Sequence, residues 1–147
     1  MRRIKQDEFT TEDTEDTEKK EELVDIGEGV SGAIIDAGLK VHRTLGPGLM
    51  ESAYEQCLAY ELGQRGVAAR RQIALPIIYE GARLDAGYRL DMVVEDSVIV
   101  EIKAVEALTA LHEAQIMTYL KLSGLRIGLL VNFNVLLFKN GLKRFVL

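Results

Sequence analysis

The stretch RLDMVVEDSVIVEIK, residues 89–103, has the pattern of two β-strands joined by a short turn. Successive side chains of a strand point to opposite faces, so Glu101 and Lys103 share a face. The alternate positions from Val98 to Ile102 are all apolar and are expected to belong to the core. One face is therefore expected to be buried, while the other presents an acid and a base in the middle of the strand.

The register of this pair decides whether a second acid joins Glu101. If residues 95–97 form the loop, Asp91 lies directly opposite Glu101 on the same face. Two carboxylates that face each other repel and destabilise the pairing of the strands. A divalent cation such as Mg²⁺ prefers carboxylate oxygens, and its binding between the two acids would make their proximity favourable. A loop of even length would put Asp91 on the wrong face, so the prediction depends on an odd loop length.

The remaining chain reads as one domain preceded by an acidic leader. Residues 1–22 contain a TED repeat and almost no apolar side chains, which predicts a disordered leader before a domain at 23–147. Of the 23 acidic and 18 basic residues, 9 and 5 lie in this leader, which leaves 14 and 13 for the domain. The domain is nearly neutral, so the net charge of −5 does not exclude a nucleic-acid partner.

The composition also limits the possible cellular location of the protein and the kinds of site that it can contain. Cys57 is the only cysteine, which excludes an internal disulfide and a cysteine zinc site. No apolar run approaches the length of a membrane span, and the first residues lack the apolar region of a secretory signal. We therefore expect a cytoplasmic protein with no membrane partner.

Periodicity and turn residues predict the element order ααβββαβββ, an α/β or α+β domain with a central mixed sheet flanked by helices. The expected helices cover residues 23–45, 49–64 and 109–123. The expected strands cover residues 68–79, 83–94, 98–105, 126–133, 136–138 and 142–146. Asn140-Gly141 between the last two strands is a strong hairpin signal.

Three motifs in this order carry a resemblance to a known family. Asp91 followed by Glu101-Ile102-Lys103 resembles the D…(D/E)-x-K signature of PD-(D/E)XK nucleases, with Leu90 in place of the usual proline. The segment from Gln115 to Tyr119 is similar to the Q-x-x-x-Y motif of RecB-like members, and these two side chains share a helix face. The segment GLMESAY, residues 48–54, resembles the signature of the small bacterial and archaeal GxxExxY family.

The resemblance implies a restriction-endonuclease-like core and a metal site. Mg²⁺ or Mn²⁺ would be held by Glu51, Asp91, Glu101 and the carbonyl of Ile102, and Lys103 would orient or deprotonate the attacking water. Gln115 and Tyr119 would orient the lysine or the phosphate. The implied activity is hydrolysis of phosphodiester bonds in nucleic acid, with DNA favoured over RNA. No helix-turn-helix or zinc finger is visible, so a homodimer or a protein partner is expected to supply specificity.

Other interpretations of the same residues stay open at this stage. Glu101 and Lys103 could form a surface salt bridge. The negative charge of Glu51 could simply interact favourably with the positive N-terminal end of its helix. Tyr119 could equally be a core aromatic, and Tyr54 is expected to pack between helix and sheet. The alternative function is a nuclease-fold module that binds nucleic acid or a protein without cleavage. A third is hydrolysis of a smaller phosphate ester, although the chain has no glycine-rich phosphate loop.

Overall fold

The computed structural model describes the backbone of residues 18–147 and the side chains from residue 29 onward. Residues 1–17, the greater part of the predicted leader, lie outside the described residues. The predicted boundary after residue 22 falls inside helix α2, which spans Glu18–Leu45. Among residues 18–147, none of the helices combines the length and the hydropathy of a membrane-spanning segment.

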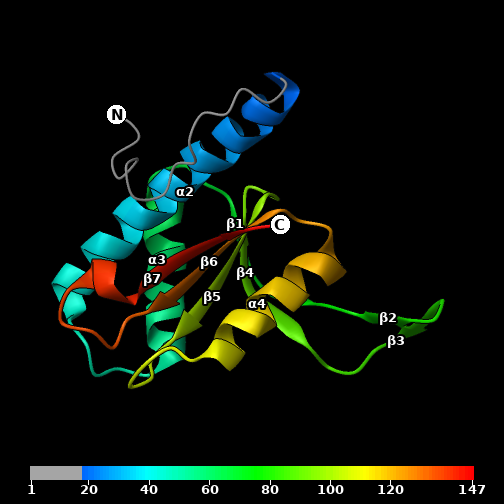
Figure 1. The fold of residues 1–147 in the computed structure, drawn as a ribbon. Coiled ribbons are helices and arrows are strands. Elements are labelled where there is room, and N and C mark those ends of the chain that lie inside the picture. Colours follow the sequence, from blue (N-terminus) through cyan, green and yellow to red (C-terminus); the bar gives the residue numbers. More distant parts are fainter. Residues whose placement is uncertain (1–17) are drawn as a thin grey trace.

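A five-stranded mixed sheet forms the centre of the fold, in the order β1-β4-β5-β6-β7 (Figure 1). The strands span Ala69–Ala74 (β1), Arg89–Val94 (β4), Val98–Lys103 (β5), Ile127–Asn132 (β6) and Leu142–Val146 (β7). Only β5 and β6 run parallel, because helix α4 (Ala110–Ser123) forms the crossover that a parallel pair requires. The predicted α/β fold with a central mixed sheet flanked by helices is confirmed.

Helices cover both faces of this sheet. On one face α2 and α3 (Glu51–Gln64) bury a large cluster that includes Leu58 and Ile102. On the other face α4 contributes Leu120 to a smaller cluster with Ile99. Strand β5 is therefore buried on both sides, which argues against the alternative that Glu101 and Lys103 form a surface salt bridge.

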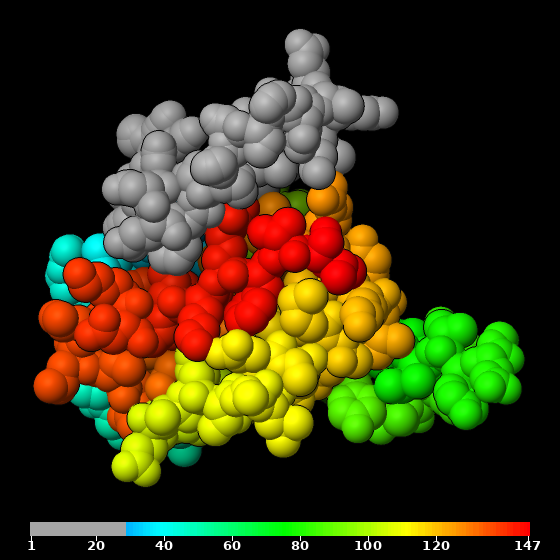
Figure 2. All heavy atoms as spheres, viewed as in Figure 1, coloured from blue at the N-terminus to red at the C-terminus, as the bar shows by residue number. Residues whose placement is uncertain are grey.

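Two of the predicted strands are each divided in two. The segment 68–79 forms β1 and then β2 (Ile77–Tyr79), and 83–94 forms β3 (Ala82–Leu84) and then β4. Pro76 separates the first two, since proline has no N–H to donate to a sheet. Strands β2 and β3 pair only with each other and project from the body of the molecule as an arm (Figures 1 and 2).

The predicted hairpin around Asn140-Gly141 is wrong. Residues Phe138–Gly141 form a 3-10 turn, and only β7 follows as a strand, antiparallel to β6. Phe138 is buried against α2, where a Cβ on Gly38 would lie 2.6 Å from its ring. A Cβ on Gly141 would lie 2.1 Å from the carbonyl oxygen of Asn132, so Gly141 serves a close backbone approach here. The observed order is thus α2, α3, β1 to β5, α4, β6 and β7.

Candidate metal-dependent active site

The predicted register between β4 and β5 is confirmed. Val94 pairs with Val98 and Met92 with Val100, so residues 95–97 form the loop and Asp91 faces Glu101. The backbone N–H of Asp91 donates to Glu101 Oε2 at 3.0 Å, and the N–H of Ile102 donates to Asp91 Oδ2 at 2.8 Å. Each carboxylate is therefore fixed by the backbone of the opposite strand.

Burial and mutual repulsion make this acid pair a costly one to ionise. Glu101 is only 4% exposed, and burial followed by the charge of Asp91 raises its pKa to about 8. Burial also raises the pKa of Asp91, with further contributions from Glu55 and Glu51, against the opposing Ile102 hydrogen bond and Lys103. Near neutral pH the pair therefore holds a proton in the absence of another cation. Strongly perturbed acids of this kind are typical of functional sites.

Lys103 lies beside the acids and is held by helix α4. Its Nζ donates a hydrogen bond of 3.3 Å to Oε1 of Gln115, a contact between β5 and the helix that follows it. Its positive charge lowers the pKa of both Asp91 and Glu101. The structure thus brings together the lysine, the glutamine and the two acids that the motifs indicated.

Tyr119 lies one helical turn beyond Gln115 and is a core aromatic, as one of the two interpretations of it expected. It is buried in the core cluster on the α4 face, with its ring 6.4 Å from that of Tyr88 in an edge-on arrangement. Burial raises the pKa of its hydroxyl, and the charge of Glu101 raises it further. Tyr119 is therefore a core aromatic that borders the acid pair.

Glu51 reaches the same end of the sheet without joining the pair. Its Oε2 accepts a hydrogen bond of 3.2 Å from the N–H of Ala104, the residue after Lys103. Its charge contributes to the raised pKa of Asp91. Among the described residues, no three His, Cys, Asp or Glu side chains gather into a ready-made metal cluster.

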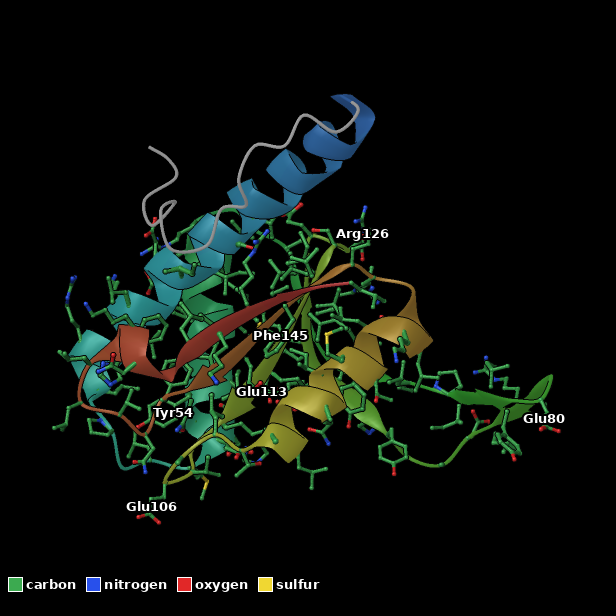
Figure 3. The ribbon with its side chains drawn as sticks, in the orientation of Figure 1. Tyr54, Glu80, Glu106, Glu113, Arg126 and Phe145 are labelled. Carbon is green, nitrogen blue, oxygen red and sulfur yellow. The ribbon has the colours of Figure 1, made fainter. Side chains whose placement is uncertain are left out.

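Tyr54 gives a physical reason for the spacing of the motif at residues 48–54. This α3 residue, labelled in Figure 3, is fully buried, and its ring stacks on Phe133 at 4.5 Å. Its hydroxyl donates to the carbonyl of Gly46 at 2.6 Å and accepts from the N–H of Leu49 at 3.1 Å. The hydroxyl therefore fixes the loop before α3 and, with it, the position of Glu51 at the start of the helix. The expected packing role of Tyr54 is confirmed.

Glu55 is a further buried acid near the pair, and the sequence motifs do not indicate it. It follows Glu51 by one helical turn and is buried at 6% exposure, with hydrogen bonds from Arg71 Nε at 3.0 Å and Gln72 Nε2 at 3.1 Å. Its charge contributes to the raised pKa values of both Asp91 and Glu101. The sequence does carry a signal for Glu55, because it lies four residues after Glu51 and residues at that spacing share a helix face.

The donor atoms at this site suit a small divalent cation. Asp91 Oδ1 and Glu101 Oε1 receive no hydrogen bond from any described residue, so each carboxylate keeps one free oxygen. The carbonyl of Ile102 lies between the acid and the lysine on the same strand. Mg²⁺ commonly binds one or two carboxylates and keeps several waters, so two acids and a carbonyl are sufficient.

The comparison with protein families agrees with this geometry. The family model described as the PD-(D/E)XK nuclease superfamily matches residues 28–145. The chain therefore belongs to the PD-(D/E)XK nuclease superfamily. No curated protein and no solved structure matches the chain.

Proposed function

We propose that this protein is a nuclease that uses Mg²⁺ or Mn²⁺ to hydrolyse phosphodiester bonds, with DNA favoured over RNA. We further propose that it belongs to the GxxExxY group of its superfamily, on the match of residues 48–54. The observation that carries the activity is the buried Asp91–Glu101 pair with Lys103 beside it. A structural ion pair would need one acid for one base, whereas this site holds two acids and raises the pKa of both.

The proposed roles follow from the contacts of each residue. Asp91, Glu101 and the Ile102 carbonyl would hold the cation, with Glu51 as a further ligand. When bound, such a cation supplies positive charge to the scissile phosphate and acidifies water. Lys103 would donate from Nζ to the attacking water or to a phosphate oxygen, which opposes the charge that develops there.

Gln115 and Tyr119 would act on the lysine and the phosphate from helix α4. Gln115 Oε1 accepts from Lys103 Nζ, so it limits the positions that the ammonium group can take. Tyr119 lies one helical turn further along α4, and its hydroxyl would help to orient the lysine or the phosphate. A homodimer or a protein partner would supply sequence specificity.

Digestion of single- and double-stranded DNA and RNA tests this proposal. The wild type should cleave DNA with Mg²⁺ or Mn²⁺ and not with a chelator. Lys103→Ala should slow cleavage by about 100-fold or more, because a positioned proton donor or acceptor commonly contributes that much. Lys121→Ala is a matched control, since Lys121 is an exposed lysine of the same helix that holds Gln115.

The outcomes separate an enzyme from a binding module. Equal cleavage by Lys103→Ala and the wild type would contradict the assigned role of the lysine. Binding of nucleic acid without cleavage, in the presence of either metal, would replace the proposed activity by a binding function.

A further inference from the structure

A groove of about 440 Å³ lies between helix α4 and the base of the β2–β3 arm. Lys103 and Gln115 line it, so it opens directly onto the acid–lysine site. Its volume lies within the range of sites that hold small organic molecules, about 300–1,000 Å³. The groove therefore has room for one substrate group next to the reacting phosphate.

The walls of the groove are mainly apolar, and one lysine lines it. Ile77, Leu111 and Leu122 contribute aliphatic surface. Among the described residues that line it, Lys103 is the only Lys or Arg, and there is no Asp or Glu. The groove thus suits a ligand with a flat or apolar body and an attached anion. An apolar peptide would cover the walls but would bring no negative charge to Lys103.

Tyr88 gives the groove an aromatic surface at its mouth. This residue lies between the arm and β4, and its side chain is 47% exposed. Its ring meets the buried Tyr119 edge-on, at 6.4 Å and 63°, so the core supports the ring without covering it. Solvent-exposed tyrosine rings beside a cation are the combination that proteins use to stack the bases of single-stranded nucleic acid.

We propose that this groove binds an unpaired nucleobase of single-stranded nucleic acid, with Tyr88 as the stacking surface. The proposal rests on the proposed nuclease function and names its substrate class. The phosphate next to the stacked base would lie at Lys103, toward Asp91 and Glu101. A base in a duplex is stacked between its neighbours and would first have to leave the helix, which disfavours a fully paired substrate.

Binding of a fluorescent single-stranded DNA and of the matching duplex, measured by anisotropy in a chelator, tests this inference without cleavage. Tyr88→Ala should weaken single-strand binding by about 5- to 150-fold, the range expected for one base–aromatic stack. Tyr88→Phe keeps the ring and should bind like the wild type. Tyr60→Ala removes another exposed tyrosine, which lies on α3 outside the groove, and should have no effect.

Three results of the binding assay would overturn the inference. They are unchanged single-strand binding by Tyr88→Ala, an equal loss for the duplex, and no binding of single strands by the wild type. If gel filtration shows that Tyr88→Ala only dissociates a dimer, a second copy of the chain covers the arm and the inference is also wrong. A protein that shows the Tyr88 effect yet neither binds Mg²⁺ nor cleaves would refute the proposed function and leave the inference standing.

Discussion

Replacement of Glu101 by glutamine should stabilise the metal-free protein at alkaline pH and remove a specific pH dependence. The glutamate is 4% exposed and has its pKa raised from 4.5 to about 8. A raised carboxyl pKa means that the folded state binds more protons than the unfolded state across this window. The contribution of Glu101 to stability is therefore greatest below pH 4.5 and is lost as the pH rises toward 8.

The size of the expected stability difference follows from the shift in the pKa of Glu101. One pKa unit corresponds to about 1.4 kcal/mol, so full ionisation of Glu101 costs the folded state several kcal/mol, roughly 3 to 6. Glu101→Gln mimics the protonated form and retains an oxygen that can accept from the N–H of Asp91. At pH 8.5 in a chelator, the variant should be more stable than the wild type by several kcal/mol, and the two should converge near pH 4.5.

Urea unfolding at a series of pH values measures this difference. Glu106→Gln is the matched control, because Glu106 is exposed in the loop after β5 and lies at the edge of the molecule in Figure 3. It should leave the pH dependence of the wild type intact. A wild-type stability that is flat between pH 5 and 8.5, or that falls equally in Glu101→Gln, would refute the reasoning about the buried acid pair.

Three further predictions concern the scaffold. Tyr54→Phe removes the hydroxyl that joins Gly46 and Leu49, and should lower the free energy of unfolding by about 1 to 3 kcal/mol in a denaturant titration. Gly38→Ala places a methyl group 2.6 Å from the ring of Phe138 and should cost about 1 to 3 kcal/mol, whereas an equal or higher melting temperature would show that the ring moves freely. Deletion of residues 1–22 should leave the melting temperature unchanged, since that segment has almost no apolar side chains; a large drop would show that it packs on the domain.

The sequence predicts the acid pair well because local rules determine it. Alternation along a strand and a loop of three residues are sufficient to place Asp91 opposite Glu101. The packing of the helix after this strand on the same sheet also follows from local rules, and the contact between Lys103 and Gln115 agrees with the resemblance to the Q-x-x-x-Y motif. The metal-binding role of Glu51 stays a prediction, as its carboxylate accepts from the backbone of Ala104.

The features that the sequence does not predict depend on contacts between distant segments. Burial of Glu101 results from the position of α4, which strand alternation alone cannot indicate. The role of Glu55 requires Arg71, which reaches it from the separate strand β1. Asn140-Gly141 has the local preference of a hairpin turn, but burial of Phe138 under α2 favours a 3-10 turn instead. In each case tertiary packing overrides or supplements the local signal.

Thermal unfolding in increasing Mn²⁺ tests the central claim, that Asp91 and Glu101 form a metal site, most directly. A cation that binds only the folded state should stabilise the wild type by about 2.7 kcal/mol at 100 times its Kd. Asp91→Asn removes one of the two free carboxylate oxygens and should show no such shift. Identical melting of the wild type with and without Mn²⁺, or an equal shift in Asp91→Asn, would contradict the metal site and the activity proposed from it.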